Sequence, residues 1–268
     1  MEGFLAGLCE MHVILNACLG EAGRQLKWNL AKHRKKQKLG LCVYCGRQGV
    51  VTENHIPPKA LFQKAAHASL LRIPSCVTCN TGASKDDEYL RTMIALSAKG
   101  ERNASFDTLV EKTVRSLVRP EAAHFRESIM RGLSETFIPS PAGVLVPAVL
   151  GDVDLSRFDK VIARIIKGIF FDERGRRLHS DYEVVSYSTA GLTRVSVAVG
   201  QRLQSYIGPL LARDPKQIGG PEFLYWSDYN PSDIDQSWWI LLIHRHHSFI
   251  GWTVEREHAT PAMNARAK

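Results

Sequence analysis

The chain has 268 residues with a formal net charge of +8 at pH 7, and 44% of its residues are hydrophobic. This length and apolar content suit one large domain or two ordinary ones and exclude a chain that is disordered throughout. The basic balance favours a polyanionic partner, above all nucleic acid. The sequence contains no apolar run of membrane-spanning length and no signal-peptide pattern, so we expect a cytoplasmic protein without a membrane span.

The first 40 residues are expected to form a helical, basic lead-in. Apolar residues recur at helical spacing between positions 4 and 30. A run of basic residues overlaps the end of this segment and continues beyond it: Arg24, Lys27, Lys32, Arg34, Lys35, Lys36 and Lys38. Such a run is either a solvated helix end or an arm that contacts phosphates, and in the second case Lys35 and Lys36 are candidate phosphate contacts.

Residues 41–100 are predicted to form a module around two C-x-x-C pairs. Four of the six cysteines of the chain make up these pairs, Cys42/Cys45 and Cys76/Cys79. In a chain without a secretion signal, paired cysteines favour metal binding over disulfides. Four thiolates suit tetrahedral zinc, and a site with four protein ligands is closed, so we expect a structural zinc ion.

Local patterns predict the elements of this module. A turn over 46–49 leads into a short strand over 50–56, which two consecutive prolines end because proline restricts the backbone. Ser84, with Asp87 three residues later, is typical of a helix N-cap, and we expect the helix to run through about Leu96.

The residues between and after the cysteine pairs make the module more specific. The first segment reads Thr52-Glu53-Asn54-His55-Ile56-Pro57-Pro58-Lys59, and the second pair continues with Asn80 and then Ser84-Lys85-Asp86-Asp87-Glu88-Tyr89. In order and spacing, this segment resembles the HNH endonuclease family, in the branch whose ββα-metal fold is held by four cysteines. The resemblance covers about 50 residues. It implies metal-dependent hydrolysis of nucleic-acid phosphodiesters, with double-stranded DNA as the expected substrate.

The resemblance also implies roles for individual residues. His55 would be the general base, because a neutral histidine accepts a proton from water near pH 7, and Asn80 would orient the site. One Mg²⁺ or Mn²⁺ ion with oxygen ligands would stabilise the phosphate and the leaving oxygen. The candidate ligands of this catalytic metal are Asn54, Glu53, Asp86, Asp87 and Glu88. The candidate phosphate contacts within the module are Lys59 and Arg91.

Three positions depart from the family pattern. Asn54 stands directly before His55, where the family usually has an acid; its amide oxygen can bind metal without charge, or Glu53 can take over. Leu71 replaces a frequent asparagine, and Lys85 lies near the place of a final histidine.

A structural interpretation of the same residues leads to an alternative function. His55 is then a strand histidine bonded to backbone, and the acids at 86–88 are favourably placed at a helix N-terminus. A zinc ribbon needs only the cysteines. The alternative is therefore a non-catalytic zinc-ribbon module that binds nucleic acid or a protein partner.

The rest of the chain is predicted to be a helical segment over 101–140 and an α+β domain of unknown role over 141–268, with a boundary at 139–143. The expected helices are 106–119, 121–135 and one through 161–169, and the expected strands are 144–150, 182–188, 192–199, 222–229, 237–244 and 248–254. The fold class is thus α+β, with an N-terminal helix, a zinc-stapled ββα-metal nuclease module and a C-terminal α+β domain. The oligomeric state is left open.

Two groups of residues invite a functional interpretation that we consider secondary. His244, His246 and His247 are expected in a turn or at the surface, since neighbouring strand residues point to opposite faces. Four tryptophans are expected mainly in the core rather than stacked on bases: Trp226, Trp238, Trp239 and Trp252.

Overall fold

The computed structural model describes residues 38–97, 103–140, 143–189 and 197–259. The chain divides into two compact units, Met1–Leu39 and Gly40–Lys268. The helix predicted over 4–30, together with Lys35 and Lys36, lies outside the described residues. The fold is mixed α+β, as expected. Among the described residues, the helices are too short or too polar to cross a membrane.

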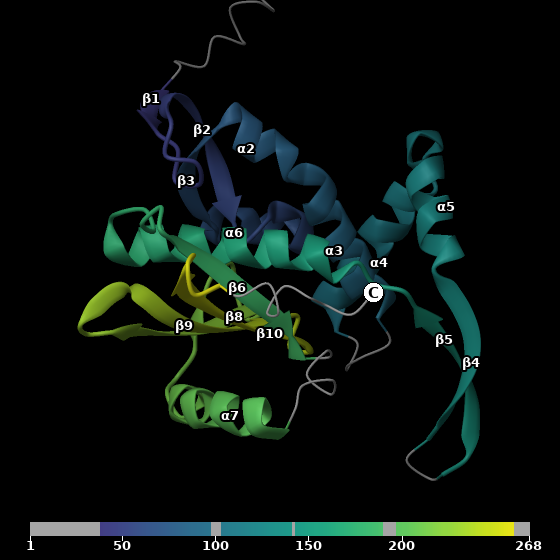
Figure 1. The fold of residues 1–268 in the computed structure, drawn as a ribbon. Helices are drawn as coiled ribbons and strands as arrows, with labels where there is room; N and C mark the ends of the chain where they lie inside the picture. Colours follow the sequence, from purple (N-terminus) through teal and green to yellow (C-terminus); the bar gives the residue numbers. More distant parts are fainter. Residues whose placement is uncertain (1–37, 98–102, 141–142, 190–196, 260–268) are drawn as a thin grey trace, which may run out of the picture. The chain divides into compact units, whose positions relative to one another are not determined.

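The cysteine-bearing part of the chain is built on a small sheet (Figure 1). Its strands are β1 (Lys38–Leu41), β2 (Gln48–Ile56) and β3 (Leu71–Cys76), in the order β1-β2-β3. β2 confirms the predicted strand, whereas β3 was not predicted because it contains Pro74. Proline is tolerated there because β3 is an edge strand of this sheet and the carbonyl oxygen of Pro74 accepts a hydrogen bond from the Val43 N–H at 3.1 Å.

Two short 3₁₀ helices, η1 (Lys59–Leu61) and η2 (Lys64–Ser69), connect β2 to β3, and two α-helices follow β3. These are α2 (Val77–Gly82) and α3 (Ser84–Leu96). The helix predicted from Ser84 is confirmed, but the predicted N-cap is wrong. α2 runs almost directly into α3, so Ser84 is already helical and its hydroxyl donates to the Thr81 carbonyl at 2.8 Å.

The helical segment that follows is shorter than predicted. It contains α4 (Ala104–Leu117), the 3₁₀ helix η3 (Pro120–Ala122) and α5 (Ala123–Arg131). Asn103 caps α4 by accepting the Phe106 N–H at 2.9 Å. The predicted helix over 121–135 ends at Arg131 instead of position 135, because residues 133–135 join the next strand.

That strand, β4 (Leu133–Pro139), pairs with β5 (Leu145–Gly151) in a separate two-stranded antiparallel sheet. The predicted boundary at 139–143 falls in the turn of this hairpin, where the Gly143 N–H donates to the Ser140 carbonyl at 2.8 Å. Proline and glycine mark tight turns as readily as linkers.

One long helix, α6 (Leu155–Arg174), forms the centre of the second unit. It begins at the N-cap Asp154 and ends at Gly175, whose φ of 65° is left-handed. Its apolar stripe is fully buried, because α6 packs against β2 and β3 on one side and against β6 and β10 on the other (Figure 1). A methyl group added to Gly168 would clash with Ile56 at 2.6 Å, so glycine permits this close approach.

The C-terminal sheet has five strands in the order β6-β10-β9-β8-β7. They are β6 (Tyr182–Ser188), β7 (Lys216–Gln217), β8 (Phe223–Asn230), β9 (Asp233–Ile243) and β10 (His247–Glu255). The strands predicted near 182–188, 222–229, 237–244 and 248–254 are confirmed. The strand predicted over 192–199 is wrong at its described end, since residues 197–199 begin α7 (Val197–Leu211). β-branched residues such as valine favour strands only weakly, and their surroundings override that preference.

His244 and His246 lie in the turn between β9 and β10, as predicted, and His247 begins β10; of the three, only His244 is buried. The turn has three residues, 244–246, because Ile243 pairs with His247, and within it His244 and Arg245 have left-handed φ values of 48° and 62°. His244 is 2% exposed, and its Nε2 lies 2.7 Å from the Leu61 carbonyl oxygen of η1. Of the four tryptophans, Trp239 is fully buried and the other three are half-buried.

Candidate metal centre and neighbouring site

The four paired cysteines come together, as predicted. Their sulfur atoms all lie within 4.8 Å of one another, and all four are free thiols. The residues are Cys42, Cys45, Cys76 and Cys79. The first pair precedes β2, and the second spans the end of β3 and the start of α2, so the cluster fastens the open end of the hairpin β2–β3, where Val51 pairs with Cys76. Four sulfur donors at this spacing could hold a metal such as zinc.

Local backbone geometry shapes the first cysteine pair. The Gly46 N–H donates to the Cys42 carbonyl at 2.9 Å, and the Cys42 N–H donates to the Arg47 carbonyl at 3.0 Å. Gly46 has a φ of +71°, and the guanidinium of Arg177 packs 2.3 Å from where a Cβ would lie. The turn after Cys45 therefore requires glycine for two reasons, conformation and space.

The electrostatics of the cluster favour a bound cation. Burial raises the pKa of the Cys42 thiol, but hydrogen bonds from the backbone N–H groups of Cys45, Cys76 and Tyr44 outweigh it and lower the pKa to about 6. The pKa of the Cys79 thiol is raised by burial and by hydrogen bonds with the neighbouring thiols. Four thiolates side by side repel one another unless a metal supplies positive charge, so this donor set fits zinc.

The hairpin β2–β3 separates the predicted catalytic residues onto two faces. Paired residues share a face and successive residues alternate. His55 lies opposite Arg72, and Glu53 opposite Pro74, so these residues share the outer face, where Glu53 and Arg72 are exposed. Asn54 points to the inner face and is 4% exposed. The two adjacent residues that the family resemblance places at one site thus point in opposite directions.

His55 is held in the neutral form near pH 7. Its pKa is lowered by burial and then by the positive charges of Lys59 and Arg72, which outweigh the opposing effect of Glu53. Arg72 also forms an ion pair with Glu53 at 3.5 Å. The outer face therefore holds a neutral imidazole beside two cations and one carboxylate, a set that can accept a proton next to a bound anion.

Asn80 serves as a link between α2 and the hairpin. Its Nδ2 donates to the Thr52 hydroxyl at 2.9 Å, and that hydroxyl donates to the Ser75 carbonyl at 3.1 Å on β3. Thr52 shares the inner face of β2 with Asn54. Asn80 thus fixes the loop after the last cysteine without lying on the face that carries His55.

The three acids at the start of α3 already have partners. Two of them pair with α6: Asp86 binds Arg157 at 2.7 Å, and Asp87 binds Arg164 through both oxygens at 2.7 and 2.9 Å. Glu88 accepts from Arg91 at 3.2 Å and from the Ser116 hydroxyl at 2.9 Å.

The ion pair between Asp87 and Arg164 is largely buried. Its pKa is raised by burial, with the Arg164 charge opposing the shift. The side chains of Asp87 and Arg164 are 18% and 11% exposed. These partners lie about 70 residues away in sequence, so local pattern could not reveal them.

Groups of at least three metal-ligating side chains, whose ligand atoms lie within 4.8 Å of one another, occur at two places in the described ranges. One is the four-cysteine cluster, and the other is Glu255, Glu257 and His258 near the C-terminal end of β10. His55 and the predicted acidic ligands do not form such a group.

The two candidate phosphate contacts of the module differ in accessibility. Lys59 is exposed on η1, close enough to His55 to affect its pKa. Arg91 is 7% exposed and faces Glu88, so it does not present its charge to solvent. Arg72 was missed by sequence reasoning, although it lies directly opposite His55. Recognising residues 71–76 as a strand would have indicated it.

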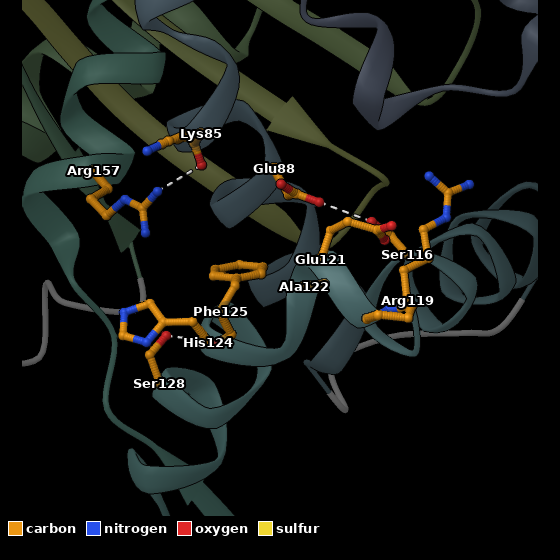
Figure 2. Close-up of a pocket in the computed structure, with 11 residues that line it drawn as sticks. Lys85, Glu88, Ser116, Arg119, Glu121, Ala122, His124, Phe125, Ser128 and Arg157 are labelled. Atoms are coloured by element: carbon orange, nitrogen blue, oxygen red, sulfur yellow. Dashed lines mark hydrogen bonds between the residues drawn. The ribbon is translucent and has the colours of Figure 1, made fainter.

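An open groove lies beside α3 and is lined by residues from α3, η3, α5 and α6 (Figure 2). Figure 2 shows Phe125 projecting into it, with Lys85 and Arg157 to one side and Arg119 to the other; Glu88 and Glu121 also line it. Cations and carboxylates are mixed along this groove, and neither the cysteines nor His55 line it. Its charge therefore does not single it out as a polyanion site.

Comparison with known proteins does not assign the chain to a family. None of the family models matches the chain, and neither the curated proteins nor the solved structures include a significantly similar one. The findings so far are a mixed α+β fold and a four-cysteine cluster that could bind a metal.

Proposed function

We propose that this protein is a metal-dependent endonuclease that hydrolyses nucleic-acid phosphodiesters, with His55 as the general base. The observation that carries the proposal is the environment of His55. This residue is kept neutral beside Lys59 and Arg72, on the accessible face of a hairpin whose open end the cysteine cluster fastens. The order strand, strand, helix of β2, β3 and α2–α3 supports the ββα-metal assignment.

In this proposal, His55 accepts a proton from the attacking water, while Lys59 and Arg72 hold the phosphate oxygens. Glu53 is the predicted metal-binding acid that shares the face of His55. Mg²⁺ is commonly held by one or two carboxylates together with substrate phosphates, and it supplies charge stabilisation for the phosphate and leaving oxygen. Glu53 is therefore its best-placed protein ligand.

The remaining predicted site residues take supporting roles in the proposal. Asp86 and Asp87 anchor α3 to α6, and Glu88 fixes the contact between α3 and α4. Asn80 orients the hairpin through Thr52. A structural zinc at the four cysteines holds the start of β2 next to the start of α2, which stabilises the hairpin that carries His55.

The test is a plasmid-nicking assay with and without Mg²⁺ or Mn²⁺. His55→Ala is expected to reduce cleavage at least ~10²-fold, the lower end of what a general base contributes. His124→Ala is the matched control, because His124 lines the groove beside α3 and not the hairpin face. Equal loss in both variants, or wild-type cleavage in His55→Ala with zinc content and circular dichroism unchanged, would remove His55 from the mechanism.

A second candidate is a zinc module that binds nucleic acid without cutting it. The ion pairs of Asp86 and Asp87 with α6 favour this alternative, because they occupy two predicted metal ligands. Duplex binding that is salt-dependent, with no metal-dependent nicking in the wild-type chain, would select it. In either case we propose that the basic chain binds double-stranded DNA, since its +8 charge favours a polyanion.

A further inference from the structure

The short 3₁₀ helix η1 carries Lys59 into the proposed site. It begins shortly after the end of β2, and Lys59 is exposed on it. Two backbone hydrogen bonds close its turn. The Leu61 N–H donates to the Pro58 carbonyl at 3.0 Å, and the Phe62 N–H donates to the Lys59 carbonyl at 3.2 Å. A single helical turn is not stable by itself, so the position of Lys59 depends on contacts from other elements.

One lysine of α4 supplies three of these contacts. The Lys112 ammonium donates to three backbone carbonyls at 3.3 to 3.4 Å, those of Lys59, Ala60 and Phe62. Carbonyl groups at the C-terminal end of a helix lack partners within it and carry partial negative charge. The three carbonyls lie 50 to 53 positions before Lys112 in the chain. Lys112 therefore ties η1 to a distant helix.

Two histidines complete the set of contacts around this turn. The Nε2 atom of His244, in the turn between β9 and β10, lies 2.7 Å from the Leu61 carbonyl oxygen. The Nε2 atom of His67, on η2, lies 3.2 Å from the Lys59 carbonyl oxygen. Each carbonyl from position 59 to position 62 thus has a side-chain nitrogen within hydrogen-bond distance. The turn is held from α4, from η2 and from the C-terminal sheet.

The donors of Lys112 indicate how this residue acts. A lysine ammonium has three N–H groups, which match the three carbonyl oxygens around it. Lys112 is also half-buried, whereas Lys59 is exposed. With its three donors directed at η1, Lys112 affects a bound nucleic acid through the position of Lys59 and not by a phosphate contact of its own.

We propose that Lys112 is a positioning residue, which fixes η1 so that the Lys59 ammonium meets a phosphate oxygen of the bound nucleic acid beside His55. This inference rests on the proposed function, because the phosphate contact of Lys59 belongs to it. The role requires lysine rather than arginine. A compact ammonium directs its donors at three carbonyls of one turn, whereas a planar guanidinium holds its donors in a fixed fork.

The test measures binding of the full-length chain to duplex DNA in EDTA, so that no cleavage occurs, over a range of salt concentrations. Loss of one phosphate contact reduces the slope of log K against log salt by ~0.9. We expect this reduction for Lys59→Ala, for Lys112→Met and for Lys112→Arg, with no further reduction in the double variant Lys59→Ala/Lys112→Met. Lys160→Met is the matched control, because it removes the same charge from an exposed position on α6.

The outcomes separate this inference from the proposed function. A wild-type slope in Lys112→Arg, or a further reduction in the double variant, would make Lys112 a phosphate contact and overturn the positioning role. A wild-type slope in Lys112→Met would overturn any role of Lys112. Absence of duplex binding by the wild-type chain would overturn the proposed function, and this inference with it.

Hydrogen exchange tests the contact itself, without nucleic acid. In Lys112→Met, the amides of Leu61 and Phe62 should exchange at least ~10-fold faster, because hydrogen bonds from a charged donor are lost. The same amides should keep their wild-type rates in Lys59→Ala and Lys160→Met, since those side chains do not hold the turn. Unchanged exchange in Lys112→Met, or equal acceleration throughout α6, would contradict a local hold on η1.

Discussion

Two antiparallel hairpins of this protein are alike in local structure and differ in what supports them. The hairpin β2–β3 has a cysteine cluster at its open end, α2 and α6 on its inner face, and a buried Ile56 and Ile73. The hairpin β4–β5 has exposed apolar side chains and two open edges within the described residues. Strand pairing alone therefore does not make a hairpin stable in water. The hairpin β2–β3 gains stability from its buried side chains and from the cysteine cluster, which could hold a metal.

Loss of the metal should have the largest effect on the difference in stability between the two hairpins. Cys79→Ser should abolish binding of about one zinc per chain and unfold the hairpin β2–β3, because structural zinc contributes ~10 kcal/mol or more of folding free energy in small modules. Metal analysis and hydrogen exchange measure the outcome. Exchange in β4–β5 and a Cys9→Ser control should be unaffected. A chain that folds normally without zinc would contradict this prediction.

The buried ion pair between α3 and α6 should give the next largest effect. Arg164→Ala leaves the Asp87 carboxylate buried without its partner, so we expect a loss of roughly 3 kcal/mol of unfolding free energy. Arg213→Ala is the matched control, because its ion pair with Asp228 is about half exposed and should be worth less than ~1 kcal/mol.

Denaturant unfolding of both variants and of Asp87→Asn measures the difference. If Asp87 is a metal ligand rather than an anchor, Asp87→Asn abolishes metal-dependent cleavage while stability changes little. That result would restore the role that the family resemblance implies.

The turns near the two hairpins each contain a glycine, and substitution of these glycines should affect stability to different degrees. Gly46 and Gly143 both have left-handed φ values, of +71° and +78°. Alanine at Gly143 meets no atom within 4 Å and should cost only the backbone strain of ~1 kcal/mol. Alanine at Gly46 must also displace Arg177, so we expect a larger loss of thermal stability and weaker zinc retention. Equal losses would show that Arg177 moves away freely.

Acidification should give the smallest effect, through the turn that contacts η1. Burial lowers the pKa of His244 in the folded state, whereas an unfolded histidine keeps its ordinary value of about 6.5. The unfolded chain therefore binds protons first, and the stability that neutral His244 contributes is complete above pH 6.5 and is lost as the pH falls below it.

His55, whose pKa is also lowered, adds to the same pH window. Comparing the pH dependence of unfolding in His244→Gln with that of the wild-type chain isolates the contribution of His244. An unchanged slope between pH 7 and the acid range would contradict the burial of His244.

Much of the local structure was predictable, and the exceptions share a cause. The apolar periodicity of residues 161–169 predicted α6, and alternation predicted β6 and β8 to β10. β3 was missed because Pro74 argues against a strand unless its neighbours are known. The predicted end of the helix near position 135 was wrong, because strand pairing of Leu133 with Gly151 outweighs the local preference of these residues for a helix.

The sequence by itself determined that four cysteines meet, since the spacing of two C-x-x-C pairs around a strand leaves them few other arrangements. It also determined which face of α6 is buried and where glycine turns occur, because periodicity and backbone conformation are local properties. Only the tertiary structure decided the partners of the charged and polar residues. Asp86 and Asp87 pair with α6, and His244 with η1, because ion pairs and buried hydrogen bonds depend on which distant element packs alongside. Which elements pack together is decided by the burial of apolar side chains throughout the core, and local sequence does not specify it.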